Sequence, residues 1–152
     1  MEIVKKYSRI ENVVFGKNCT IVEPVNLFNC VLKNNVFVGP FVEIQGDVII
    51  DSFTRISSHS LICAKAQIGK NCFVGHGVMF ANDLFKNNIR SGDKRIFLPI
   101  KIGDNVNIGS NATILPVSIC SNVTIGAGAV VTKNIFESGS YAGNPAKLIR
   151  KY

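Results

Sequence analysis

Residues 44–62 read IQGDVIIDSFTRISSHSLI, and every sixth residue of this stretch is isoleucine. The same spacing runs unbroken through nine large apolar residues, which are Leu32, Val38, Ile44, Ile50, Ile56, Ile62, Ile68, Val74 and Phe80. A small or β-branched residue often follows four positions later, as at Val36, Val42 and Val48. A period of six fits neither the α-helix nor simple strand alternation. It predicts a triangular coil of three short strands, with the large residue filling each corner of a prism.

The hexad pattern continues on both sides of this stretch. It is found at Phe15, Ile21, Leu27, Ile102, Ile108, Ile114, Ile119, Ile125 and Val131, with one-residue slips before Leu32 and Ile119. These eighteen hexads predict an all-β parallel β-helix of about six coils, forming a single domain over residues 1–152. Each strand would pair with the coils on either side, so strand edges would be exposed only at the two ends. Gly, Asn and Asp between hexads suit corners that need a positive φ.

Two segments depart from the repeat. Residues 81–99 are polar and charged, and we expect them to leave the prism as one long excursion loop. A long loop projecting from a regular solenoid is more often functional than idle, although it can be a plain flexible insertion. Residues 134–152 follow the last hexad, and we expect them to cap the open end of the prism, with Pro145 opening a short helix.

Composition limits the partners and the compartment. The chain carries 17 Lys and Arg against 10 Asp and Glu, and this net charge of +7 suits an anionic partner such as CoA or a nucleotide-sugar. The positive residues are scattered, so we expect neither nucleic acid nor a membrane as a partner. No stretch reads as a signal peptide or approaches the ~20 apolar residues of a membrane span. The five cysteines form no CxxC pair, which indicates reduced thiols in a cytoplasmic protein.

Three segments of the C-terminal half carry a family resemblance. IGDNVNIGSNATILP (102–116), VTIGAGAVVTK (123–133) and AGNPAK (142–147) resemble the hexapeptide-repeat acyltransferases. The resemblance implies a left-handed β-helix, acetyl-CoA as the acyl donor, and a homotrimer with sites in the clefts between prisms. It departs from the usual pattern after Pro116, where relatives carry a Gly that completes the hexad.

A further segment narrows the acceptor. FVGHGVMFANDLF (73–85) is similar to the N-acetyltransferases that act on nucleotide-linked 3-amino-deoxysugars, whose nucleotide is dTDP or UDP. This resemblance implies transfer of an acetyl group to the amine of such a sugar. It also implies a place in cell-surface glycan synthesis, for lipopolysaccharide or an S-layer.

Three residues are candidates for the chemistry. His76 lies near a corner between two glycines and is a candidate base or polar contact to the acceptor. Asn82 and Asp83 open the excursion loop, where in a trimer they would face His76 of a neighbour. Asp83 would orient the amine or accept its proton, and Asn82 would bond the thioester or the sugar. The plainer alternatives are a corner histidine bonded to the next coil and an Asx turn leaving the coil. In another alternative, the leaving CoA thiolate takes the amine proton itself.

Binding residues are predicted on both sides of His76. His59, Phe85 and Arg90 are candidates for the acceptor, and His59 lies one coil before His76. For acetyl-CoA the candidates are Gly109, Gly126, Ala127, Gly128, Asn144 and Lys147. Small residues would leave backbone groups free for the amide-rich pantetheine arm, and Lys147 or Arg150 would meet a phosphate.

Other functions on this fold remain as alternatives. A sugar or serine O-acetyltransferase is one, although such enzymes carry a histidine in the excursion loop and this loop has none. A γ-type carbonic anhydrase needs three histidine ligands, and the chain has two histidines, so no metal site is predicted. A non-catalytic scaffold is the last alternative, because fold alone does not decide function.

Overall fold

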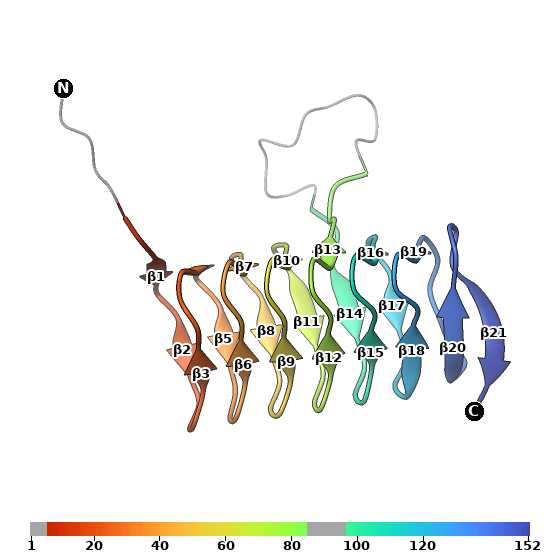
Figure 1. Cartoon of the computed structure of the whole chain (residues 1–152), viewed down its shortest axis with the longest axis horizontal. Helices are drawn as coiled ribbons and strands as arrows, with labels where there is room; N and C mark the ends of the chain where they lie inside the picture. The colour runs from red at the N-terminus through yellow and green to blue at the C-terminus, as the bar shows by residue number, and fades with distance from the viewer. Residues whose placement is uncertain (1–5, 85–96) are drawn as a thin grey trace.

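The computed structural model describes residues 6–84 and 97–152, and these residues form a prism of stacked triangular coils (Figure 1). The strands lie on three faces, which we name sheets A, B and C in the order in which the chain visits them. No helix occurs in the described ranges, so none of these residues provides a helix able to cross a membrane.

Each of the first six coils contributes one strand to each sheet. Sheet A contains β1 (Arg9–Glu11), β4 (Asn26–Phe28), β7 (Glu43–Ile44), β10 (Leu61–Ile62), β13 (Met79–Phe80), β16 (Thr113–Ile114) and β19 (Val130–Val131). Sheet B contains β2 (Val14–Phe15), β5 (Val31–Leu32), β8 (Ile49–Ile50), β11 (Ala66–Ile68), β14 (Ile100–Ile102) and β17 (Ser118–Ile119). Sheet C contains β3 (Thr20–Ile21), β6 (Phe37–Val38), β9 (Arg55–Ile56), β12 (Phe73–Val74), β15 (Asn107–Ile108), β18 (Val123–Ile125), β20 (Gly139–Ala142) and β21 (Lys147–Lys151).

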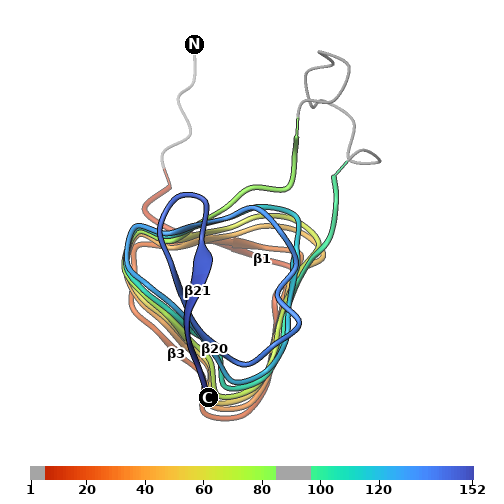
Figure 2. The ribbon, with the colours of Figure 1, turned by 90° about the vertical axis from the view of Figure 1, so that its right-hand side faces the viewer.

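The coil is left-handed, as the family resemblance implied. Seen from the C-terminal end, the chain passes clockwise from sheet A to B to C while it advances toward the viewer (Figure 2). This hand is opposite to that of most crossovers between parallel strands. The predicted all-β parallel β-helix is therefore confirmed.

The hexad residues form the core in continuous columns. On sheet A, Ile44 pairs in register with Leu27 on one side and with Ile62 on the other. All three side chains are fully buried, as are the large hexad residues of most other coils. Burying each such side chain contributes roughly 2 kcal/mol before conformational entropy is subtracted. The coils from Leu27 to Val131 repeat this contact, which confirms the predicted core there, whereas Phe15 in the first coil is 42% exposed at the open end of the prism.

The corners are made by residues with a left-handed backbone. We name the A–B, B–C and C–A corners after the sheets that they join. Positive φ angles occur at Asn12, Asn18, Asn29, Asn35, Phe41, Asp47, Phe53, His59, Lys65, Asn71, Gly77, Asn105, Asn111, Asn122 and Gly128. Most of these are Asn, Asp or Gly, the residues that tolerate this conformation best. On the B–C corner the asparagines also bond to one another, because Nδ2 of Asn105 donates to Oδ1 of Asn122 at 3.1 Å.

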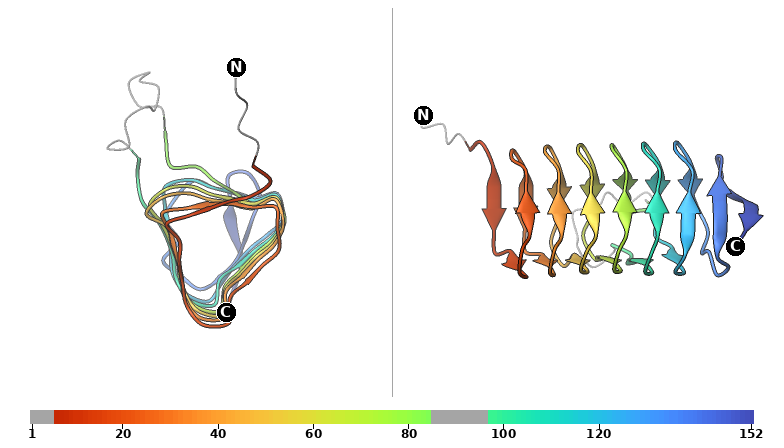
Figure 3. Two further views of the ribbon diagram at one scale, coloured as in Figure 1. Left: turned by 90° about the vertical axis from the view of Figure 1, so that its left-hand side faces the viewer. Right: turned by 60° about the horizontal axis from the view of Figure 1, so that its bottom comes forward.

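The C-terminal end differs from the prediction. After six three-stranded coils, β19, a bridge between Ile119 and Ile135, and β20 form a seventh turn. The chain then reverses at Gly143 (φ 96), and β21 pairs antiparallel with β20 (Figure 3). The predicted helix opened by Pro145 is therefore wrong. A five-residue segment is too short for a stable helix, whereas the edge of β20 offers it hydrogen bonds along its length.

The excursion leaves and re-enters the prism at the A–B corner. β13 ends at Phe80 and β14 begins at Ile100, so the interruption spans the residues that the sequence indicated. The backbone N–H of Leu98 donates to the carbonyl oxygen of Asn82 at 3.0 Å, and Nζ of Lys65 donates to the carbonyl oxygen of Phe97 at 3.2 Å. These two bonds close the neck of the excursion against the coil beside it.

Candidate functional site

Most of the predicted site residues stand in one row along the C–A corner. The turns of successive coils carry Pro40-Phe41, Ser58-His59, His76-Gly77, Ser110-Asn111, Ala127-Gly128 and Asn144-Pro145. Backbone hydrogen bonds join these turns, for example from the N–H of Gly77 to the carbonyl of Ser58 at 3.0 Å. Another runs from the N–H of Asn111 to the carbonyl of His76 at 2.8 Å. The row is thus a rigid ladder with one turn every ~4.8 Å.

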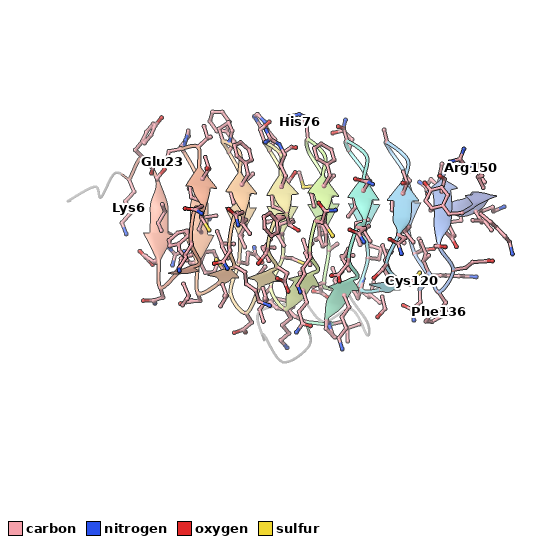
Figure 4. All side chains as sticks on the ribbon, turned by 90° about the horizontal axis from the view of Figure 1, so that it is seen from below. Lys6, Glu23, His76, Cys120, Phe136 and Arg150 are labelled. Carbon is pink, nitrogen blue, oxygen red and sulfur yellow. The ribbon has the colours of Figure 1, made fainter. Side chains whose placement is uncertain are left out.

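His76 stands in the middle of this row with its ring exposed (Figure 4). Its Nδ1 lies 2.9 Å from Oγ of Ser58, in the coil before it. When Nδ1 carries the proton and donates to that hydroxyl, Nε2 keeps its lone pair and faces outward as an acceptor. In that tautomer Nε2 can accept a proton from a ligand on this corner.

The glycines beside His76 are explained by coil packing. A Cβ on Gly75 would lie 2.7 Å from the backbone nitrogen of Ser110, and Gly77 has φ 64. Both positions therefore favour glycine whatever binds nearby. On the side of Gly75 the next coil, rather than a ligand, fills the space that the absent side chain leaves.

His59 lies one coil before His76, as predicted from the repeat. Its exposed ring stacks on Phe41, with 4.8 Å between the ring centroids and 29° between the planes. Phe41 was not among the predicted site residues. Phe41 lies three hexads before His59 in the repeat, and this spacing is the sequence signal that places both residues on the same corner.

The six predicted acetyl-CoA residues also lie on or beside the C–A corner, beyond His76. A Cβ on Gly109 would lie 2.4 Å from the backbone nitrogen of Ala127, and a Cβ on Gly126 would lie 2.9 Å from the Cβ of Ala142. Gly128 differs, because a Cβ there would meet nothing within 4 Å. Asn144 and Lys147 are exposed on the last turn and on β21. Open space for a ligand at this end is therefore found at Gly128 rather than at the other two glycines.

Asn82 and Asp83 lie on a different corner. Asn82 is only 8% exposed, and its Nδ2 donates to the carbonyl oxygen of Ala64 at 3.0 Å. In earlier coils of this A–B corner a backbone N–H makes the equivalent bond, as from Lys65 to Gly46. The amide of Asn82 thus replaces the backbone donor where the chain leaves the coil. Sheet A separates these residues from His76 within one chain, so any meeting of the two requires a second chain.

The root of the excursion borders a hollow of about 310 Å³. Asn82, half-buried Asp83, Phe97 and Cys63 are among the residues that line it. Burial raises the pKa of the Cys63 thiol to about 12, so this thiol is protonated at neutral pH and is not a nucleophile. The predicted acceptor residues Phe85 and Arg90 lie outside the described residues. Within residues 6–84 and 97–152, no group of three His, Cys, Asp or Glu side chains is placed to hold a metal ion.

Known proteins share the repeat and the fold. The family described as the hexapeptide repeat of succinyl-transferase matches residues 11–40 and 99–133. The bifunctional protein GlmU of Buchnera aphidicola subsp. Schizaphis graminum is 34% identical over 109 residues, which make up 65% of this chain and 23% of that protein. The chain thus matches less than a quarter of the length of this curated relative.

Two solved structures share the whole coil. The polysialic acid O-acetyltransferase OatWY is 26% identical, has a TM-score of 0.60, and matches over 94% of this chain and 89% of its own. The maltose O-acetyltransferase from Clostridium difficile 630 is 26% identical, has a TM-score of 0.57, and matches over 93% and 70%. The fold and the corner row therefore define the chain as a left-handed β-helix protein of hexapeptide repeats. Within that class, the chain is similar to hexapeptide-repeat acetyltransferases.

Proposed function

We propose that the protein is an acetyl-CoA-dependent N-acetyltransferase acting on the amine of a nucleotide-linked 3-amino-deoxysugar, with dTDP or UDP as the nucleotide. The observation that carries this proposal is the arrangement of side chains along the C–A corner. The exposed His76 ring lies between the aromatic rings of Phe41 and His59 on one side and small residues such as Gly128 on the other. The open corner at Gly128 lies two coils from His76, about 10 Å at ~4.8 Å per coil. A pantetheine arm laid along these turns would bring its thioester toward His76.

The reaction follows from these positions. The neutral amine attacks the thioester carbonyl carbon, the C–N bond forms, and the C–S bond breaks as the tetrahedral intermediate collapses. Nε2 of His76 takes the proton that the amine loses, and this proton then passes to the CoA thiolate. If His76 only positions the acceptor, the thiolate takes the proton directly and the products are the same.

We further propose that the enzyme works as a homotrimer. In that assembly the A–B corner of one chain, with Asn82 and Asp83, faces the C–A corner of its neighbour, where Asp83 orients the acceptor amine. The buried amide of Asn82 supports this arrangement by holding the root of the excursion in place. Among the described residues all five cysteines are free, which suits a reducing compartment such as the cytoplasm.

A sugar O-acetyltransferase is the second candidate. The two structural relatives at 26% identity carry names of this activity, for polysialic acid and for maltose. The segment 73–85 and the lack of a histidine in residues 81–99 favour the amine. The two candidates differ in the acceptor atom, so acceptor choice separates them.

The test is a thiol-release assay with acetyl-CoA against dTDP- and UDP-linked amino sugars, their hydroxyl counterparts, and maltose. Turnover that requires the 3-amino group is the expected result. Turnover only with hydroxyl acceptors would replace the proposal by the O-acetyltransferase. Silence across the panel, with a folded protein, would contradict both.

Two substitutions assign the roles in the same assay. His76→Ala is expected to lower kcat at least 100-fold with little change in the KM of either substrate, because a general base contributes to the chemical step. Asp83→Asn is expected to lower turnover at least tenfold while the assembly persists. A His76→Ala enzyme with wild-type kcat would leave proton removal to the thiolate.

A further inference from the structure

Aromatic rings occupy the N-terminal half of the C–A corner where Asn or Gly is the easier choice. Phe41 and His59 have φ angles of 59° and 63°. Bulky residues rarely adopt this backbone conformation, and most other corners of this chain use Asn, Asp or Gly. Phe41 is also 57% exposed, so its ring gains little from burial in the prism. The fold thus gives no reason for a phenylalanine at this position.

The two rings form a platform with one free side. His59 stacks on Phe41 from the following coil. On the side of the preceding coil, Phe41 borders a hollow of about 300 Å³ whose other walls include Tyr7, Pro24 and Asn26. A flat ring entering this gap would stack on Phe41 and lie beside Tyr7. Stacking on exposed aromatic side chains is how proteins commonly hold nucleobases.

Asn26, which lines the same hollow, also carries a side-chain acceptor for which the described residues supply no donor. Nδ2 of Asn26 donates to Oε2 of Glu43 at 2.9 Å, and Oε1 of Glu43 accepts from Nε2 of Gln45 at 2.8 Å. These bonds hold the Asn26 amide in one orientation. Its Oδ1 is enclosed and has no hydrogen-bond partner among the described residues. A buried acceptor without a partner is costly, and a ligand with a ring N–H would satisfy it after a small shift.

We infer that this gap, which we name the base site, holds the uracil or thymine of the acceptor nucleotide. The base stacks on Phe41, and its ring N–H donates to Oδ1 of Asn26. The inference rests on the proposed function in taking the base to be part of the acceptor. The base site lies between two and three coils from His76, about 12 Å at ~4.8 Å per coil. The diphosphate and the sugar bridge this distance past Ser58 and His59, which brings the amine to His76.

The position of the base site separates the two substrates. It lies on the N-terminal side of His76, while the small residues proposed for acetyl-CoA lie on the C-terminal side. Phe41 therefore contributes to acceptor binding and leaves acetyl-CoA binding unaffected. The adenine of CoA is the competing occupant, and it also lacks the ring N–H that Asn26 requires.

The chain provides a matched control for testing Phe41. Phe53 has the same turn position on the B–C corner, with φ 62 and 64% exposure, and it borders none of the hollows described above. Phe41→Asn and Phe53→Asn each place a well-tolerated residue at a positive φ, so both are expected to fold with an unchanged or higher melting temperature. A purely structural role for Phe41 predicts the same behaviour from both variants.

The experiment is calorimetric titration of the protein and both variants with UDP, dTDP, CDP, ADP and CoA. We expect Phe41→Asn to raise the Kd for UDP or dTDP at least tenfold, with the Kd for CoA unchanged, and Phe53→Asn to match wild type. Wild type should also bind UDP or dTDP at least fivefold more tightly than CDP, whose cytosine lacks the ring N–H.

Contrary results are equally distinct. Equal nucleotide binding by wild type and Phe41→Asn, equal weakening by Phe53→Asn, or no nucleotide binding by wild type would overturn the inference. A loss of CoA binding in Phe41→Asn alone would overturn it in favour of adenine. Phe41-dependent nucleotide binding without acetylation of any amino sugar would support the base site and defeat the proposed function. If Phe41→Asn acetylates an amino sugar with an unchanged acceptor KM, the result would support the proposed function and overturn the base site.

Discussion

The two halves of the C–A corner share a backbone and differ in their side chains. On the N-terminal side of His76, the turns carry Phe41 and His59, whose rings stack and face outward. On the C-terminal side, the equivalent positions are Asn111 and Gly128. The backbone ladder and the positive φ are the same in both halves. The fold requires a residue with a positive φ at this place in the turn. It does not restrict the side chain there, so the side chain can be chosen for contact with a ligand.

Several of these turns have a glycine at their first position for another reason. A Cβ on Gly39 would lie 2.9 Å from the backbone nitrogen of Ser58, and Gly75 and Gly109 are closer still to the next coil. These positions are therefore glycine because the next coil lies too close for a side chain, in both halves of the corner. Function is to be sought in the second and third positions of the turn, which include Ser58, His76 and Gly128.

The largest expected effect comes from a bulky substitution at the first position of a turn. Gly109→Val places a branched side chain against the backbone of Ala127, which cannot move without separating two coils. We expect a loss of about 3 kcal/mol in the free energy of unfolding, measured by urea titration. Gly128→Asn is the matched control, because its position is open and has φ 68. Wild-type stability in Gly109→Val would show that coil spacing does not require glycine there.

A smaller effect tests whether the two halves of the C–A corner bind different substrates. Gly128→Asn keeps the turn but fills the open corner proposed for the pantetheine arm. We expect the KM for acetyl-CoA to rise about tenfold, roughly 1.4 kcal/mol of lost binding, with nucleotide affinity unchanged. Steady-state kinetics with each substrate varied in turn makes the measurement. A change in acceptor KM instead would show that the halves do not separate the two substrates.

The smallest effect concerns the first coil, which supports the base site. Hydrogen bonds from Arg9 and Lys6 lower the pKa of Glu11 from 4.5 to about 2. Because the folded value is the lower one, this stabilisation is complete above pH 4.5 and is lost as the pH falls toward 2. Glu11→Gln should lower the melting temperature by on the order of 1 °C at pH 7, since exposed pairs contribute little. Melting curves of both proteins from pH 7 to 2 should converge at the acid end, and a constant difference would contradict the assignment.

The coil could be predicted well from the sequence because every hexad places a large apolar residue at the same position, where it packs against the hexads of the neighbouring coils. Leu27, Ile44 and Ile62 had to be buried together once the period was known. The cap was mispredicted because Pro145 suggests a helix start locally, while the edge of β20 decides the outcome from a distance. Phe41 was missed because a phenylalanine in an apolar repeat reads as core, and only the corner geometry shows that it faces outward. The burial of Asn82 depended on its bond to Ala64 in another coil, which no local pattern encodes.

The closed neck of the excursion has a consequence for how such proteins diversify. The bond between Leu98 and Asn82 lets the chain leave and rejoin the A–B corner without disturbing the ladders on either side. Doubling the length of a flexible loop costs only about 0.6 kcal/mol in closure entropy. We therefore expect the coils on either side to fold with connections of different length between Asn82 and Leu98. A change in the chain between Asn82 and Leu98 would then alter what the A–B corner presents while the prism keeps its ladders.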